Sequence, residues 1–272
     1  MSHKTDGKRA STAHVERAST TRDERVERTR GNVWRRIALF VLACAYVILW
    51  VGGVGHYLFV GAVAAEQSWL ASAFLSVAGL IVLLAATSRR AALQLVAVAA
   101  LGLGFELCGV RYGLPFGLYA YTGVLQPTIF GVPLVMAFAW MSLVAYLKQS
   151  LSRLPLKPWV GALIASAWMT TIDLVIDPLA ANQLGYWRWV ERGSYYGIPS
   201  SNFVGWFVCS LSIFLLFRQK WQPNFWHRLT GASIILFFTL VALSFQLYLA
   251  ALFGFGLCAA ELLIHLRRKI AS

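Results

Sequence analysis

Residues 168–206 read WMTTIDLVIDPLAANQLGYWRWVERGSYYGIPSSNFVGW, and the rest of the chain is organised around this stretch. It opens inside an apolar run, places Asp173 and Asp177 four residues apart, and then meets Pro178. It crosses an aromatic loop and returns to apolar sequence through Asn202. Acidic side chains at the edge of a hydrophobic segment cost free energy, so their presence needs a reason. The stretch therefore predicts a polar pocket at one face of a membrane protein.

The composition supports a membrane location. The chain has 272 residues, of which 58% are hydrophobic and only 13% are charged, whereas a soluble domain carries about 25% charged residues. The net charge of +13 does not indicate a nucleic-acid partner. Outside the N-terminal tail, the basic residues lie in short segments between apolar runs, where they orient a membrane protein.

The apolar runs predict an all-α, polytopic bundle of about eight transmembrane helices, with seven as the alternative. A membrane-spanning helix needs roughly 20 apolar residues. The last run, residues 231–266, is too long for one span, and we expect it to form two helices that turn near residues 244–248. The other runs are Ile37–Tyr57, Trp69–Thr87, Ala91–Val110, Ile129–Leu147, Trp159–Ile176 and Phe203–Phe217.

The basic residues of the connecting segments predict the orientation. With eight spans, every strongly basic segment lies on one side of the membrane, and that side is expected to be cytoplasmic. Seven spans would put Arg267–Lys269 on the other side. We therefore expect a multi-pass protein of the cell membrane with both termini in the cytoplasm. Residues 1–32, which lack apolar periodicity, are expected to be a disordered basic tail, and residues 33–272 a membrane-embedded catalytic domain.

This topology places the intramembrane acids at one membrane face. Glu106, Asp173 and Asp177 lie near the outer ends of their spans, and Asn202 begins a span on the same side. Carboxyl groups four residues apart share a helix face, with Cβ atoms about 5–6 Å apart. One is expected to stay protonated while the other ionises, as a general acid and its partner base require. We predict Asp173, Asp177 and Glu106 as catalytic residues.

Each acid also has a structural explanation. A proline follows Asp177, and the residue before a proline disfavours the helical conformation, so Asp177 can simply end its helix. Glu106 can form a helix-packing hydrogen bond to a neighbouring span. For Glu261, which lies near the Arg267–Lys269 cluster, an ion pair is the better explanation.

Aromatic side chains are concentrated in the two outer segments that follow these acids. Most fit an interfacial belt of Trp and Tyr. The alternative is an aromatic lining that accepts a polyene and stabilises a carbocation through its ring faces. The candidate substrate-binding residues are Tyr119, Tyr121, Trp187, Trp189, Tyr196, Asn202 and Trp206.

Metal and cofactor motifs are not evident in the sequence. The four cysteines lie inside apolar runs without zinc or iron–sulfur spacing, and the histidines are scattered over both membrane sides. We expect no metal and no cofactor, and a reaction that needs only acids, aromatic rings and water.

Four sequence blocks resemble a known family, the integral-membrane carotenoid hydratases of the CruF type, which includes bisanhydrobacterioruberin hydratases. The resemblance covers about residues 100–210. It implies a hydro-lyase of carotenoid biosynthesis that adds water across the terminal C1,2 double bond of an acyclic ψ end group, giving a tertiary alcohol. The implied partners are a carotenoid, water, membrane lipid and other carotenoid enzymes. The blocks are GLPFGLYAYT at 113–122, GVPLVMAFAW at 131–140, WMTTIDLVIDP at 168–178 and GYWRWVERGSYYGIPSSNFVGW at 185–206.

Two other function classes fit some of these features. The DLVID pair resembles half of an aspartate-rich magnesium site of membrane prenyltransferases that elongate carotenoids, although the sequence offers no second pair. A transporter whose acids relay protons is the other alternative, although we find no internal inverted repeat.

Overall fold

The computed structural model describes residues 33–61, 69–152 and 154–271. The chain divides into two compact units, residues 1–43 and residues 44–272. The described part of the first unit, residues 33–43, is helical. The tail predicted over residues 1–32 lies outside the described residues.

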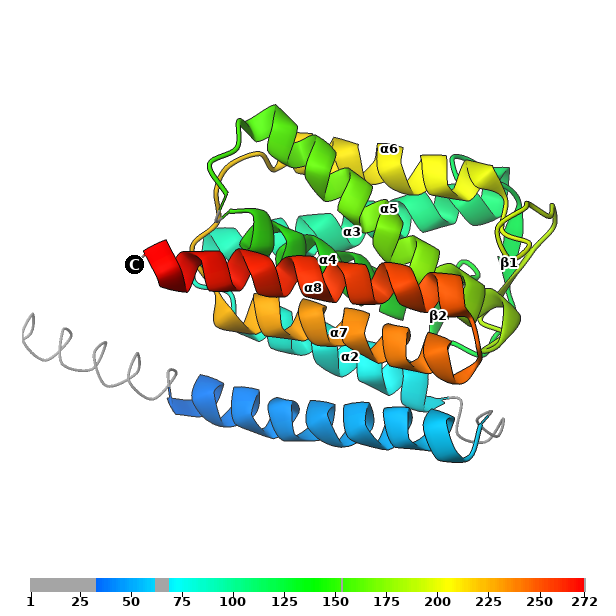
Figure 1. Ribbon diagram of the computed structural model, residues 1–272, viewed down its shortest axis with the longest axis horizontal. Helices are drawn as coiled ribbons and strands as arrows, with labels where there is room; N and C mark the ends of the chain where they lie inside the picture. The colour runs from blue at the N-terminus through cyan, green and yellow to red at the C-terminus, as the bar shows by residue number, and fades with distance from the viewer. Residues whose placement is uncertain (1–32, 62–68, 153, 272) are drawn as a thin grey trace, which may run out of the picture. The chain divides into compact units, whose positions relative to one another are not determined.

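Eight helices account for most of the described residues, which confirms the all-α prediction. The expected division of the last apolar run is also confirmed, because one helix ends at Ser244 and the next begins at Tyr248. The helices are Val33–Phe59, α2 Trp69–Leu84, α3 Arg89–Tyr112, α4 Val135–Leu151, α5 Pro158–Asn182, α6 Ser200–Leu216, α7 Phe225–Ser244 and α8 Tyr248–Ala271 (Figure 1).

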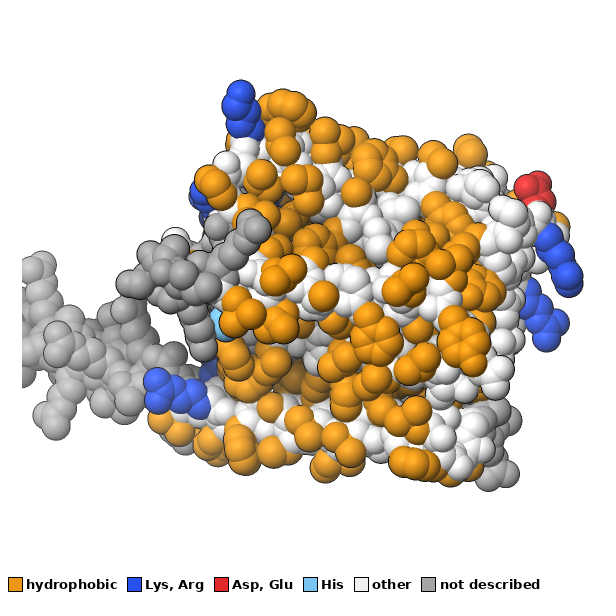
Figure 2. All heavy atoms as spheres, viewed as in Figure 1, with side chains coloured by type: hydrophobic (Ala, Val, Ile, Leu, Met, Phe, Trp, Pro, Cys, Tyr) orange, Lys and Arg blue, Asp and Glu red, His pale blue; other side chains and the backbone are white. Residues whose placement is uncertain are grey.

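The helices have the length and surface of membrane spans. Five of them are long and apolar enough to cross a membrane, namely Val33–Phe59, α3, α5, α7 and α8, and the apolar helices α2, α4 and α6 are shorter. On residues 44–272, Figure 2 shows hydrophobic side chains along the helices and charged side chains toward the helix ends. This distribution is that of a polytopic helical membrane protein.

Helix α4 is the most enclosed helix of the unit 44–272, with 14 of its 17 residues buried. A helix that is apolar all round is expected in such a central position. Its neighbours approach closely through small residues, as is usual in membranes. At Gly102 of α3, an added Cβ would lie 2.4 Å from the Trp140 ring of α4, so only glycine leaves room for that ring.

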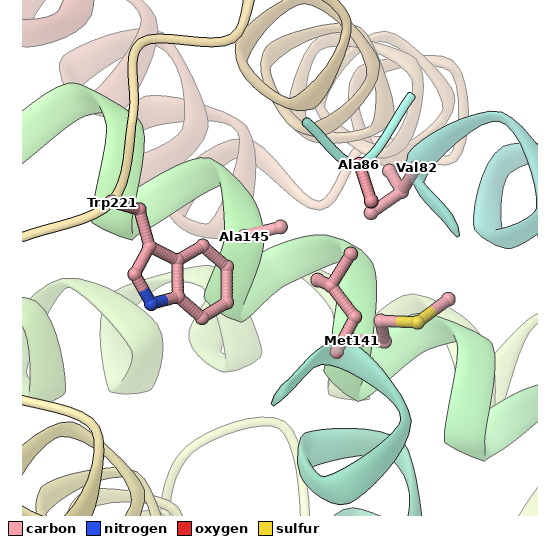
Figure 3. Close-up of a cluster of buried hydrophobic side chains, with 6 residues drawn as sticks. Val82, Ala86, Met141, Ala145 and Trp221 are labelled. Atoms are coloured by element: carbon pink, nitrogen blue, oxygen red, sulfur yellow. The ribbon is translucent and has the colours of Figure 1, made fainter. Parts of the chain in front are cut away.

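A cluster of buried apolar side chains fixes the segment between α6 and α7. Trp221 of this segment belongs to the same cluster as Val82 of α2 and Met141 and Ala145 of α4 (Figure 3). The ammonium group of Lys148 lies 5.5 Å from the centre of the Trp221 ring. The segment between α6 and α7 is therefore held against α4 by packing.

Helix α5 continues past the point where we expected it to end. Its predicted span stopped at Ile176 before Pro178, but the helix runs through Pro178 to Asn182. A proline has no N–H for the carbonyl four residues earlier. The Tyr195 hydroxyl donates to that carbonyl, on Leu174, at 2.8 Å. Because a distant side chain replaces the missing donor, the helix persists, and the interpretation of Asp177 as a helix stop is wrong.

Two short β-ribbons were not expected from the sequence. Strands β2 (Thr128–Ile129) and β3 (Val132–Pro133) pair with each other. Strand β1 (Tyr119–Tyr121) pairs antiparallel with β4 (Trp187–Trp189), with Tyr119 opposite Trp189 and Tyr121 opposite Trp187. Side chains two apart on a strand share a face. This ribbon therefore presents two tyrosines and two tryptophans on one face.

Candidate active site

Asp173 and Asp177 of α5 meet Asn202 of α6 in the interior of the unit. The Asn202 amide nitrogen donates to Oδ2 of Asp173 at 2.6 Å and to Oδ2 of Asp177 at 2.7 Å. Asp173 and Asp177 are 2% and 1% exposed. Asn202, which we predicted as a substrate-binding residue, joins the two aspartates through its amide nitrogen and also lines the cavity described below.

Two indole groups from strand β4 hold the second aspartate. Trp187 and Trp189 donate their Nε1 hydrogens to Oδ1 of Asp177, at 2.7 and 3.1 Å. Among the described residues, Asp177 receives three hydrogen bonds, counting that from the amide of Asn202, whereas Asp173 receives one, from Asn202. The two aspartates thus differ in the number of donors around them.

Glu106 of α3 is enclosed by a separate set of donors. The hydroxyl groups of Tyr119 and Tyr121 donate to its Oε2 at 2.5 and 2.8 Å, and the indole of Trp140 donates to its Oε1 at 3.0 Å. Glu106 is only 4% exposed. Glu106 does form a hydrogen bond between helices, as its structural explanation predicts, because Trp140 belongs to α4. The other two donors to Glu106, Tyr119 and Tyr121, come from β1.

The β1–β4 ribbon thus serves both acidic centres. Its tyrosines bind Glu106 and its tryptophans bind Asp177, while ring centroids lie 5.0 Å apart for Tyr119 and Trp189 and 5.9 Å apart for Tyr121 and Trp187. Burial, and after it the Glu106 carboxyl group, raise the pKa of both tyrosine hydroxyls above the usual value. The two hydroxyls therefore remain donors at neutral and moderately alkaline pH.

A cavity with an empty volume of about 280 Å³ joins the two centres. Nine of the ten predicted site residues line it. The exception is Tyr196, whose hydroxyl accepts from the backbone N–H of Leu249 at 3.2 Å, at the start of α8. Tyr196 therefore does not line this cavity, and its role as a substrate contact stays a prediction. The lining comprises Glu106, Phe116, Tyr119, Tyr121, Met136, Asp173, Asp177, Trp187, Trp189, Asn202 and Trp206.

Three residues that line the cavity or bind its acids were not singled out in the sequence. Phe116 and Met136 line the cavity, and Trp140 binds Glu106 while stacking on Trp206, with ring centroids 4.4 Å apart and planes 7° apart. Phe116 and Met136 carry no signal that separates them from ordinary apolar packing. Trp140 does, because an indole N–H inside an apolar helix needs a hydrogen-bond partner.

The described residues contain no group of three or more His, Cys, Asp or Glu side chains arranged to hold a metal ion. The four cysteines are free thiols, of which Cys209 is buried, whereas Cys44 and Cys108 are exposed.

The fold and this cavity define a polytopic helical membrane protein that buries three carboxyl groups among aromatic rings. The chain belongs to the carotenoid biosynthesis protein family, whose sequence model matches residues 67–264. The match extends on both sides of residues 100–210, the part that carried the resemblance seen in the sequence.

A curated relative is the bisanhydrobacterioruberin hydratase of Haloarcula japonica. It is 37% identical to this chain over 134 residues, which make up 47% of this chain and 45% of the relative. The match thus spans less than half of the relative's length. No solved structure matches this chain.

Proposed function

We propose that this protein is a carotenoid hydratase, a hydro-lyase that adds water across the terminal C1,2 double bond of an acyclic ψ end group. The product is a tertiary alcohol. The proposal is supported by the family, by the name of the relative from Haloarcula japonica, and above all by one observation. Two buried aspartates share the Asn202 amide inside an aromatic cavity, yet receive unequal numbers of hydrogen bonds.

The unequal donor sets support different roles for the two aspartates. Donors around a carboxyl group favour its ionised form, because a carboxylate has only acceptor sites. Asp177 and Glu106 each receive three donors, and Asp173 receives one. Asp173 is therefore the group that holds a proton, and Asp177 is the carboxylate base. Glu106, which also receives three donors, is then ionised and does not serve as the proton donor.

The reaction follows from these roles. The π electrons of the double bond take the proton from Asp173, so a C–H bond forms at C2 and a tertiary cation remains at C1. A water molecule attacks C1, and Asp177 takes the proton that this water loses. A proton transfer from Asp177 to Asp173 restores the starting state, and no other reactant is consumed.

The remaining lining residues stabilise the cation. Ring faces attract a positive charge, and the cavity offers the rings of Trp189, Trp206 and Tyr119 among others. The carboxylate of Glu106 adds a negative charge, which its tyrosine partners hold in place. Water expelled from such a site leaves these interactions stronger than they would be in solution.

We also propose that both termini lie in the cytoplasm and that the cavity faces the outer leaflet. The argument is the positive-inside rule applied to eight spans. A carotenoid would then enter from the bilayer, and water would enter from the membrane surface. A reporter fused to the C-terminus that is active only in the cytoplasm tests the orientation.

The direct test is pigment analysis of a lycopene-producing bacterial host that expresses the chain. We expect a pigment heavier by one water molecule, with an unchanged chromophore, and its absence when Asp173→Asn is expressed at the same level. An Asp173→Asn variant with full activity would contradict the assigned role. A magnesium-dependent gain of an isoprenoid unit by the pigment would instead support the prenyltransferase alternative. Uptake of a solute into proteoliposomes would support the transporter alternative.

A further inference from the structure

A second cavity lies at the opposite end of α5 from the acids. It has an empty volume of about 590 Å³ and lies between the end of α4, the start of α5 and the end of α6. Helix α5 begins at Pro158, so at 1.5 Å per residue roughly 22 Å of helix separate this end from Asp173. The proposed hydration site does not use this cavity. We call it the basic cavity because of the side chains that line it.

Four cationic side chains line the basic cavity, and none of its lining residues is acidic. Within the described residues, the one salt bridge joins Arg228 to Glu261, so the cations of the cavity have no carboxylate partner there. Three of the four are exposed at its rim. The four are Lys148, Lys157, Arg218 and Lys220.

The lysine from α4 keeps the far wall of the cavity in place. The Lys148 ammonium group donates to the backbone carbonyl groups of Phe217 and of Gln219, the latter at 2.8 Å. These carbonyls follow the end of α6, beside Arg218. Lys148 therefore positions the segment that carries two other cations of the cavity, Arg218 and Lys220.

The start of α5 adds a further positive contribution. Lys157 occupies the position before the helix without capping it through a side chain, and Pro158 and Gly161 of the first turn line the cavity. The N-terminus of a helix carries a partial positive charge and unpaired N–H groups, which favour anions such as phosphate. The N-terminus of α5 and the cationic side chains thus both favour an anion in this cavity.

The deeper wall of the cavity is apolar. A ligand for this cavity must therefore be an amphiphile, with an anionic head at the rim and hydrocarbon within. The apolar lining residues are Leu147, Leu151, Leu154, Leu156, Ala162, Ala165 and Phe214.

We propose that the basic cavity binds an anionic phospholipid. Its phosphate group lies among Lys157, Arg218 and Lys220 at the start of α5, and an acyl chain follows the apolar wall between α4, α5 and α6. Charge complementarity and the position at one end of the bundle, where lipid headgroups lie, both point to this occupant.

Binding is measured by native mass spectrometry on the full chain in a neutral detergent, titrated with phosphatidylglycerol or with phosphatidylcholine. We expect tighter binding of phosphatidylglycerol. The double variant Arg218→Gln/Lys220→Gln should weaken that binding by about tenfold or more, since each basic side chain near a headgroup contributes several-fold. The matched control is Arg188→Gln/Arg192→Gln, which removes the same charge from exposed positions near the other end of α5 and should leave binding unchanged.

A second variant tests the cavity without changing its charge. The nearest heavy atom to an added Cβ at Gly161 is Cβ of Leu156 at 4.0 Å, so Gly161→Phe can place its ring in the cavity without a clash at Cβ. We expect it to displace the lipid as well. Equal binding of both lipids, equal weakening by the two double variants, or full binding by Gly161→Phe would overturn the proposal. Competition by inorganic phosphate alone at the lipid's concentration would show a phosphate site rather than a lipid site.

Discussion

The buried acids at the two ends of the bundle are held in different ways. Glu261 of α8 forms an ion pair with Arg228 of α7, as we expected for this acid, although its partner lies on another helix. At the other end, Glu106, Asp173 and Asp177 receive hydrogen bonds from neutral indole, phenol and amide groups, and in the described residues none has a cationic partner. An ion pair fixes the charge of both partners, whereas a shell of neutral donors leaves an acid able to gain and lose a proton.

The largest effect is expected when the proton donor is removed. Asp173→Asn should lower the rate of hydration by about 100- to 10,000-fold, which is the usual contribution of a general acid. The amide oxygen of the new side chain can still accept from Asn202, so the helix packing should remain. Pigment analysis gives the rate, and thermal unfolding in detergent checks the fold. A folded variant within threefold of the wild-type rate would contradict the assignment.

At the ion pair of Glu261 and Arg228 we expect a loss of stability without a loss of hydration rate. Glu261→Gln leaves the Arg228 charge without its partner, so the free energy of unfolding should fall by about 1–3 kcal/mol. The hydration rate per folded molecule should not change, because Glu261 and Arg228 do not line the cavity that contains Asp173. Thermal unfolding and pigment analysis on the same preparation separate the two quantities. A rate loss like that of Asp173→Asn would remove the distinction between the two ends.

A smaller effect is expected from the shell of neutral donors. Trp189→Phe keeps the aromatic ring but removes one of three hydrogen bonds to Asp177, and should lower the rate about tenfold, in line with one bond to a charged group. The matched control is Trp159→Phe, which changes an exposed tryptophan at the far end of α5. Equal rates for the two variants would show that the Asp177 contact is not used in the reaction.

The smallest effect is expected at Glu106. Tyr121→Phe leaves the donors Tyr119 and Trp140 in place, and should lower the rate by a few-fold. Because burial raises the pKa of both tyrosines, their hydroxyls stay protonated as the pH rises through the ordinary tyrosine value near 10. The rate should therefore show no loss from these hydroxyls below that pH. A hydration rate that falls below about pH 10 in the wild-type protein but not in Tyr121→Phe would contradict this expectation.

The sequence predicted the helices and the acids better than it predicted the segments between helices. Apolar runs set the spans, and the four-residue spacing of Asp173 and Asp177 sets their common face, because both depend on local geometry. Strands of three residues are too short for a reliable periodic signal. Even so, the alternation in YAY at 119–121 and WRW at 187–189 is the pattern of a ribbon with one aromatic face.

Other features could not be read from local sequence because distant residues create them. The course of α5 through Pro178 depends on the Tyr195 hydroxyl, which is supplied from beyond the end of the helix. The donor set that separates Asp173 from Asp177 comes from β4 and α6, so the two acids look equivalent in sequence and differ only in the fold.

The most direct test of acid-catalysed hydration traces the oxygen of the product. Membranes that contain the wild-type protein are given an acyclic carotenoid with ψ end groups in water enriched in heavy oxygen, and the pigments are analysed by mass spectrometry. The proposed reaction predicts a tertiary alcohol whose hydroxyl oxygen comes from the labelled water, and no such product with Asp173→Asn. An unlabelled hydroxyl group, or an unchanged pigment with folded protein present, would contradict it.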